Sequence, residues 1–282
     1  MNFDNLKVYA QYFLPKHLLT IIVGFFADLK LGSLTTLAIK QFARFYHINT
    51  AEMSGKIEDF KTFNDFFSRP LKAGARPINS DDKSLVFPAD GRISAFGNLK
   101  DNLQLQAKNH YFTIDALLAS EQDSQTFKNG SYITVYLSPS DYHRVHIPLA
   151  GKLLKMTYVP GELFSVNPLY TKNIPELFSR NERVVCLFET EIGKMAVILV
   201  GAAIVRSIAM NWCGIVAPQK SKIPVVIQYN NQNINFNKGD EIGKFMMGST
   251  VICLFEKDKI KFENSLVEER HVNMGTKMAE II

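Results

Sequence analysis

The sequence predicts an α+β protein with a helical N-terminal region and a mainly antiparallel β domain. Apolar residues recur at helical spacing across residues 4–47. From Ser84 onward the chain changes to short runs rich in β-branched and aromatic residues. Turn-forming sequences such as Pro160-Gly161 and Lys238-Gly239-Asp240 separate these runs, as expected of strands joined by tight connections.

The first expected elements are helices within residues 4–47, broken near Pro15 and around Gly32-Ser33. Leu18, Ile22, Phe25 and Leu29 form an apolar stripe at helical spacing, and Leu34, Leu37, Ala38, Phe42 and Phe45 repeat the pattern. Such stripes pack on the protein's own core or lie in a lipid interface, and both interpretations stay open here because different faces can do each.

Basic residues favour the membrane interpretation of this region. Lys7, Lys16, Lys30, Lys40 and Arg44 face only Asp4 and Asp28, and each cation near an anionic lipid surface contributes roughly 1 kcal/mol. The longest apolar run, Leu18 to Ala27, is shorter than the ~20 residues that cross a bilayer, so we expect no spanning helix. The N-terminus also lacks the pattern of a secretory signal.

We place a boundary after this region, giving residues 1–75 as the membrane-associating part and 76–282 as the β-rich part. Between them, residues 51–82 form a connection with a short helix at 63–67, closed by Arg69-Pro70. The expected strands are Leu85–Phe87, Tyr132–Leu137, Leu153–Val159, Val184–Glu189, Met195–Val205, Val225–Gln228 and Ser249–Phe255.

Composition excludes several classes of protein. The 282 residues are 46% hydrophobic and 21% charged, which is typical of a globular chain. The net charge of +5 is spread along the sequence without a basic, aromatic-rich cluster, so nucleic-acid binding is not expected. Cys186, Cys213 and Cys253 stand singly, which argues against a structural zinc knuckle and favours a reducing compartment.

The pair Gly248-Ser249 is the strongest chemical signal. It lies between the glycine-rich segment Gly239–Gly243, interpreted as a turn, and the β-prone run that ends at Phe255. Glycine permits strained backbone angles and close approach, so the serine hydroxyl can attack the preceding carbonyl. This makes Gly248-Ser249 a candidate self-cleavage site, although most Gly-Ser pairs only cap turns.

Asp90, His143 and His146 complete the candidate set. Asp90 lies in the turn sequence Pro88-Ala89-Asp90-Gly91. Ser138-Pro139-Ser140-Asp141 is typical of a helix start, and one helical turn after it would bring His143 and His146 onto one face. A carboxylate that orients an imidazole, which in turn accepts a hydroxyl proton, is the arrangement that activates serine.

At these residues the chain resembles phosphatidylserine decarboxylase. The resemblance runs from about residue 4 to the C-terminal region, and Met247 stands where bacterial members commonly have leucine. It rests on six blocks in the family's order: FNDFFSRPLKAGARPI (63–78), PADG (88–91), YLSPSDYHRVHIP (136–148), VPGELFSVNP (159–168), FSRNERV (178–184) and MGST (247–250).

The resemblance implies an enzyme that makes its own cofactor. His146, oriented by Asp90, would remove the proton of Ser249, whose oxygen attacks Gly248; elimination and hydrolysis then leave a pyruvoyl group in place of Ser249. This ketone condenses with the amine of phosphatidylserine and withdraws electrons as carbon dioxide leaves, giving phosphatidylethanolamine. His143 would donate a proton to the carbanion or hold the substrate carboxylate.

The resemblance also implies the partners and the location. The two cleavage products would form a heterodimer, with a dimer of such pairs left open, and no metal is expected. The substrate is phosphatidylserine in an anionic membrane, so the protein is expected at the cell membrane, peripherally and on the cytoplasmic side. The block 159–168 would line the substrate pocket, although Leu163, Phe164 and Val166 also fit a core, and Arg69 would contact lipid phosphate or water.

Two other functions stay open from the residues alone. The same four side chains suit a serine hydrolase, or a zinc hydrolase with Asp90, His143 and His146 as ligands, but the G-x-S-x-G and H-E-x-x-H patterns are absent. A non-enzymatic, membrane-attached β module would need a carrier lysine at a hairpin tip, and Lys244 has poor flanks for that role.

Overall fold

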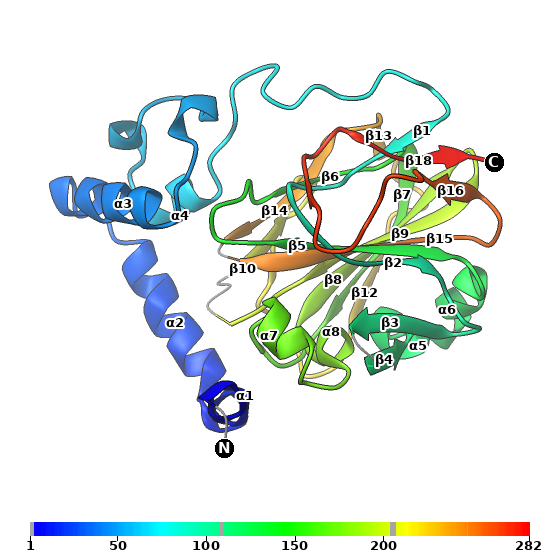
Figure 1. Ribbon diagram of the computed structural model, residues 1–282, viewed down its shortest axis with the longest axis horizontal. Coiled ribbons are helices and arrows are strands. Elements are labelled where there is room, and N and C mark those ends of the chain that lie inside the picture. Colours follow the sequence, from blue (N-terminus) through cyan, green and yellow to red (C-terminus); the bar gives the residue numbers. More distant parts are fainter. Residues whose placement is uncertain (1–2, 108–109, 204–206, 247) are drawn as a thin grey trace.

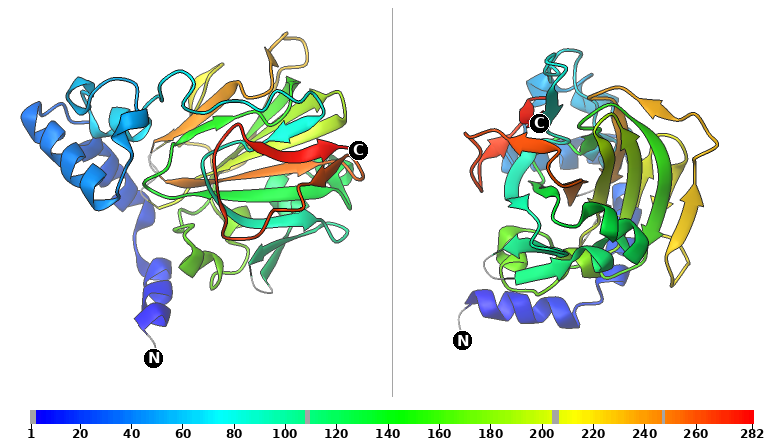
Figure 2. Two further views of the ribbon diagram at one scale, coloured as in Figure 1. Left: turned by 45° about the horizontal axis from the view of Figure 1, so that its top comes forward. Right: turned by 90° about the vertical axis from the view of Figure 1, so that its right-hand side faces the viewer.

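The computed structural model describes residues 3–107, 110–203, 207–246 and 248–282. It confirms the α+β class: N-terminal helices project from a β-rich body whose strands curve around one core (Figures 1 and 2). The helices are α1 (Phe3–Phe13), α2 (Lys16–Ala27), α3 (Ser33–Phe45), α4 (Phe63–Phe67), α5 (Ile114–Leu118), α6 (Glu121–Phe127), α7 (Pro168–Thr171) and α8 (Leu177–Arg180). Two 3₁₀ turns, η1 (Thr50–Glu52) and η2 (Ile57–Asp59), precede α4.

The N-terminal breaks fall where the sequence predicted them. Pro15 separates α1 from α2, which meet at an angle of 86°. Gly32 precedes α3 with φ +57°, a left-handed conformation that glycine adopts readily. Among the described residues, no single helix has the length and apolar character to cross a bilayer; α1 and α2 pass that test only as a bent pair.

The nine-stranded sheet contains all seven predicted strand runs except the first, which pairs elsewhere. Its order is β12-β7-β8-β9-β15-β5-β2-β17, with β13 also on β7, and every pairing is antiparallel. Its strands are β2 (Gly91–Asn98), β5 (Ser131–Leu137), β7 (Gly151–Val159), β8 (Arg183–Thr190), β9 (Gly193–Val200), β12 (Val225–Gln228), β13 (Asn235–Phe236), β15 (Ser249–Phe255) and β17 (His271–Val272). The expected run Met195–Val205 was too long, because β9 ends at Val200 and residues 201–203 are not strand. Residues 204–205 lie outside the described part, as does Met247 of the MGST block.

Three smaller sheets complete the body. A four-stranded sheet has the order β11-β10-β14-β6, formed by β6 (Arg144–His146), β10 (Ser207–Met210), β11 (Gly214–Ala217) and β14 (Glu241–Met246). β1 (Ser84–Val86), β18 (Lys277–Ile281) and β16 (Ile260–Phe262) form a second, and β3 (Leu103–Ala107) with β4 (His110–Thr113) a third.

Two expectations about local structure were wrong. Ser138–Tyr142 forms a turn rather than a helix start, and the residues after it enter strand β6. The glycine-rich segment Gly239–Gly243 is a turn only at its beginning, because Glu241 already belongs to β14. Two of the connections between the two larger sheets lead to the candidate site residues, the one from β5 to β6 and the one from β14 to β15.

Strand β15 lies in the middle of the nine-stranded sheet. All seven of its residues are buried, and it pairs with β5 on one side and β9 on the other. The later strands β16, β17 and β18 pair within their own segment or with β1 and β2. Everything after Gly248 is therefore held by sheet pairing to residues before it.

Candidate active site

Ser249 is fully buried at the start of β15, where it pairs with Leu137 of β5. Its Oγ has no hydrogen-bond partner among the described residues. Gly248 has φ +23°, and the space where a Cβ would stand is open. A buried hydroxyl without a partner is costly, so its presence beside a glycine in an unusual conformation is the pattern expected of a reacting group.

Asp90 reaches the same end of the sheet from β2. Arg92 pairs with Tyr136, the neighbour of Leu137, so the Asp90 turn lies two strand spacings, or about 10 Å, from Ser249. A Cβ at Gly91 would stand 2.3 Å from the Tyr136 carbonyl oxygen, which explains the glycine after Asp90. The turn can approach β5 only because that side chain is missing.

The Asp90 carboxylate is held by groups that the sequence did not indicate. Arg76 donates from Nε at 2.9 Å and from Nη2 at 2.6 Å, and the amide of Met274 donates at 2.8 Å. Arg76 also pairs with Glu52 at 2.9 Å. This forked pairing fixes the position of the Asp90 carboxylate.

His146 lies beside the Asp90 turn, but a different group determines which of its ring nitrogens carries the proton. Its amide donates to Pro88 O at 2.7 Å, and its Nδ1 donates to Gly239 O at 2.7 Å. Nε2 therefore carries the lone pair and accepts from the Tyr142 hydroxyl at 3.2 Å. We expected Asp90 to fix this tautomer; in the described residues, a backbone carbonyl does so instead.

His143 immediately precedes β6 and contacts the end of β14 that leads to Gly248. Its carbonyl accepts from Phe245 N at 3.0 Å, three residues before Gly248, whereas His146 pairs with Glu241 at the opposite end of β14. Its Nδ1 donates to Asp141 O at 2.9 Å, the Phe67 ring packs on it at 4.1 Å, and Nε2 has no partner among the described residues. The two histidines thus contact opposite ends of β14. Residues three apart in extended chain also point to opposite faces.

Burial keeps both imidazoles neutral. It lowers the pKa of His143 to about 3, with the nearby Arg69 charge acting in the same direction. Burial also lowers the pKa of His146, against the Gly239 hydrogen bond and the charges of Glu241 and Asp90. Each imidazole therefore presents a proton-accepting Nε2 at neutral pH.

This neutral burial predicts a pH-dependent stability. Between pH 3 and 6.5 an unfolded chain protonates His143 while the folded chain does not, so the free energy of unfolding decreases as the pH falls below about 6.5. We expect a loss of about 2 kcal/mol from this residue between pH 7 and pH 5. Thermal unfolding should show a shallower pH dependence in His143→Gln and an unchanged one in His110→Gln. Equal slopes for wild type and His143→Gln would contradict this.

Arg69 and Asp141 support the His143 loop. Arg69 is buried rather than lipid-facing or solvated as we expected, and its Nη2 donates to Ser140 O at 3.0 Å and Asp141 O at 3.3 Å. The Asp141 carboxylate accepts from Ser138 N and Oγ, both at 2.7 Å, and lies 3.1 Å from His271 Nε2. His271 comes from β17, beyond the candidate cleavage site.

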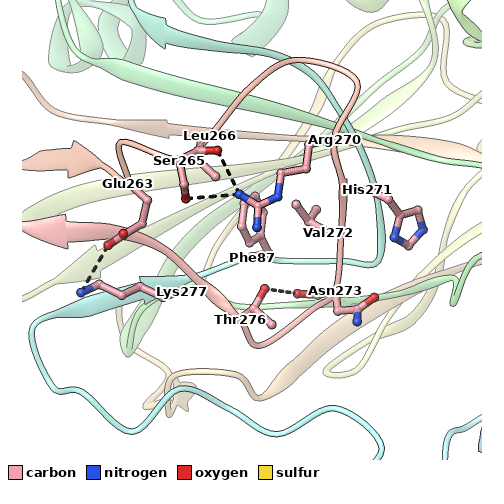
Figure 3. A pocket seen from close by; sticks show the side chains of 10 residues that line it. All are labelled: Phe87, Glu263, Ser265, Leu266, Arg270, His271, Val272, Asn273, Thr276 and Lys277. Atoms are coloured by element: carbon pink, nitrogen blue, oxygen red, sulfur yellow. Dashed lines mark hydrogen bonds and ion pairs between the residues drawn. The ribbon is translucent and has the colours of Figure 1, made fainter.

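A polar cavity of about 280 Å³ is lined by Phe87 and by residues of the C-terminal segment 263–277 (Figure 3). Its cationic side chains already have partners: Lys277 pairs with Glu263 at 3.3 Å, and Arg270 donates to Ser265 O at 3.0 Å. His271 lies at one edge. The cavity contains none of the predicted site residues.

The described part of the chain contains no set of side chains that could bind zinc as the hydrolase alternative requires. No three His, Cys, Asp or Glu side chains there come close enough to hold a metal ion. Asp90 is instead engaged by Arg76, and both histidines bond backbone carbonyls through Nδ1.

Comparisons with known proteins agree along the whole chain. Residues 63–280 match the family model described as phosphatidylserine decarboxylase, and residues 6–47 match a model named PSD. Phosphatidylserine decarboxylase proenzyme of Haemophilus ducreyi is 48% identical over 286 residues, covering 99% of this chain and 96% of the relative. The proenzymes of Actinobacillus pleuropneumoniae serotype 5b (46% over 284 residues; 99% and 96%) and Shewanella sediminis (47% over 284 residues; 99% and 99%) are similarly close.

Proposed function

Because the chain belongs to the phosphatidylserine decarboxylase family, we propose that residues 76–282 form its catalytic part and residues 1–75 its membrane-associating part. The activity is the pyruvoyl-dependent decarboxylation of phosphatidylserine to phosphatidylethanolamine and carbon dioxide. The chain is the proenzyme, and its ketone arises from a serine when the chain cleaves itself. We assign this serine as Ser249, because its buried hydroxyl has no partner among the described residues and lies next to Gly248.

We propose that cleavage begins when the Ser249 oxygen attacks the Gly248 carbonyl and its proton passes to the Nε2 of His146, once Nε2 has left the Tyr142 hydroxyl and approached Ser249 from the other end of β14. The amide becomes an ester and frees the Ser249 nitrogen. Loss of the Ser249 Cα proton expels the Gly248 carboxylate as a new C-terminus, and water then releases ammonia to leave the ketone. Asp90 lies beside His146, and its charge favours the imidazolium that forms.

The ketone supplies the electron sink for the loss of carbon dioxide. A ketone formed from Ser249 would lie at the head of the central strand β15. In the resting chain His143 is a neutral acceptor, so it returns a proton to substrate only after gaining one. A substrate carboxylate beside Nε2 favours that gain, because an opposite charge stabilises imidazolium.

His143→Ala tests this division of roles. We expect complete cleavage with a ketone at the new N-terminus, and a kcat lower by about 10²- to 10⁴-fold, the usual contribution of a general acid–base group. Intact mass spectrometry reports cleavage, and carbon dioxide release reports turnover. An uncleaved His143→Ala chain would assign this imidazole to maturation instead.

Membrane attachment is proposed for the outer faces of α2 and α3, on the cytoplasmic side. Ile22 and Phe26 are 43% and 64% exposed on α2, and Leu34 and Phe45 are 62% and 75% exposed on α3. The basic residues contribute less than their number suggested. Lys16 is buried against Glu162, and Lys40 pairs with Glu58 at 2.7 Å. Apolar insertion is therefore the main source of affinity that we propose.

The double variant Ile22→Ser/Phe26→Ser should bind vesicles containing phosphatidylserine at least tenfold more weakly, since each apolar side chain contributes on the order of 1.5–3 kcal/mol when buried. Vesicle flotation measures the binding, in a Ser249→Ala background that prevents turnover. Val267→Ser, which removes an apolar side chain that is 59% exposed on the C-terminal segment, is the matched control. Equal binding by both variants would exclude α2 as the attachment surface.

A further inference from the structure

The segment 271–274 follows the cleavage site and contacts two polar groups that lie before it. At one end, His271 Nε2 lies 3.1 Å from Asp141 Oδ1, in the loop that precedes β6. At the other end, the amide of Met274 donates to the Asp90 carboxylate at 2.8 Å. After cleavage, the product that carries the ketone would therefore also hold both of these carboxylates of the other product.

Main-chain pairing anchors this segment to the N-terminal product. In β17, His271 pairs with Arg92 of β2. Gly275 N donates to Phe87 O at 3.1 Å. These contacts use only the backbone, as does the bond from Met274 to Asp90. A substitution at His271 therefore removes the contact with Asp141 and leaves the pairing of the segment available.

Asp141 connects His271 to the His143 ring. Its Oδ2 accepts from Ser138 N and Oγ, both at 2.7 Å, while its Oδ1 faces His271. Its main-chain oxygen accepts from His143 Nδ1 at 2.9 Å. This bond keeps the proton on Nδ1 and the lone pair on Nε2 of His143. A change in the position of Asp141 therefore also changes the orientation of the ring.

Arg69 and His271 contact different atoms of Asp141. Arg69 Nη2 donates to the main-chain oxygen at 3.3 Å. A carboxylate oxygen only accepts hydrogen bonds, so His271 Nε2 donates to Oδ1. Loss of the His271 donor loosens the side chain of Asp141 while Arg69 still holds its main chain.

The bond from His271 to Asp141 should affect turnover more than folding. The His271 side chain is 48% exposed, and its ring lies on the other side of the chain from the Arg270 guanidinium (Figure 3). Charged contacts with such exposed side chains contribute little to stability. In contrast, a misplacement of about 1 Å in a reacting group can slow a reaction by about 10²-fold.

We propose that His271 is a positioning residue for the decarboxylation step: it fixes Asp141, whose carbonyl oxygen holds the His143 ring towards the substrate. The proposal rests on the proposed function and on the role given there to His143. It also explains why the two products must stay together after cleavage. One supplies His143, and the other supplies both the ketone and the donor that orients His143.

A matched pair of variants tests the proposal. Methionine and glutamine have similar lengths, but only glutamine offers a nitrogen donor where Nε2 of His271 lies. We expect His271→Met to cleave completely and to lower kcat about tenfold. Its KM on short-chain phosphatidylserine should stay within about twofold of wild type, because no substrate contact is removed. His271→Gln should recover most of the lost kcat.

Two controls separate positioning from a general effect on the fold. Asn273→Ala changes an exposed side chain of the same segment and should behave as wild type. The unfolding temperature of His271→Met should fall by less than about 4 °C, as expected when an exposed contact is lost. A larger fall, or an equal loss of kcat in His271→Met and His271→Gln, would assign the residue to folding and overturn the proposal.

A double-mutant cycle with Asp141→Asn tests the route of the effect. If His271 acts through Asp141, then His271→Met lowers kcat in the wild-type background and has little further effect in Asp141→Asn. Additive losses, an unchanged kcat in His271→Met or incomplete cleavage of that variant would each overturn the positioning role.

Wild-type protein separates failure of this proposal from failure of the proposed function. Ketone content and release of carbon dioxide are measured in the same preparations. Wild type that contains the ketone and releases carbon dioxide, beside variants that give an overturning result, would remove the role of His271 alone. Wild type that lacks the ketone or releases no carbon dioxide would overturn the proposed function itself.

Discussion

Replacing Ser249 with alanine is expected to leave one full-length chain with no decarboxylase activity. Alanine lacks the oxygen that attacks Gly248, so neither the cleavage nor the ketone can form. The loss should be complete, because the missing group is the source of the cofactor. The fold should persist, since the wild-type Oγ makes no hydrogen bond among the described residues.

Intact mass spectrometry under denaturing conditions checks this result directly. Wild type should give two masses that divide after Gly248, the C-terminal piece carrying a ketone reducible by borohydride. Ser179→Ala, which removes an exposed serine hydroxyl elsewhere, should be processed as wild type. Cleavage or activity in Ser249→Ala would eliminate the self-processing scheme.

Replacing His146 with alanine is the second large effect that we expect. Its Nε2 is the neutral acceptor beside Asp90, and removing a general base typically slows a reaction by about 10²- to 10⁴-fold. Purified His146→Ala should therefore remain mostly uncleaved under conditions in which the wild type is fully processed. The cleaved fraction, followed by mass over time after synthesis, gives the rate.

His110→Ala is the matched control for His146→Ala and should mature normally. His143→Ala gives the informative contrast because the Nε2 of His143 has no partner among the described residues, whereas the Nε2 of His146 accepts from Tyr142. Normal cleavage of His146→Ala together with arrested cleavage of His143→Ala would reverse the roles that we assign to the two histidines.

Local sequence signals predicted the elements that depend on local interactions. Pro15 and Gly32 lie in the two expected breaks between the helices, and β-branched residues marked β8 and β15 closely. Ser249 was placed correctly at the start of a strand because a flexible glycine precedes a continuous β-prone run. In these places the backbone preference and the tertiary pairing agree.

The turn Ser138–Tyr142 shows why other elements could not be predicted. Asp141 reaches back to Ser138 N, as it would in a capped helix. What differs is the chain that follows, which pairs with β14 almost a hundred residues later. Local hydrogen bonding is the same in both cases, so only the distant strand decides the outcome.

The candidate site shows the same limit. The candidate residues were proposed from their chemistry, which is specific, but their supporting partners could not be predicted. Arg76 holds Asp90, and the Gly239 carbonyl fixes the tautomer of His146; an arginine and a peptide carbonyl carry no local signature of those roles. Lys16 was assigned to the membrane surface for a similar reason, since nothing near it in sequence indicates Glu162.

The central place of β15 makes the catalyst non-renewable. A dissociable coenzyme is replaced from solution once it is damaged, whereas here the reactive carbonyl would be the first atom group of a strand clamped by neighbours on both sides. Reduction of that carbonyl, or protonation at its carbon during a turnover, would inactivate the whole molecule permanently. Supply of active enzyme then depends on new synthesis, and the lifetime of each molecule is set by how many turnovers its single terminus survives.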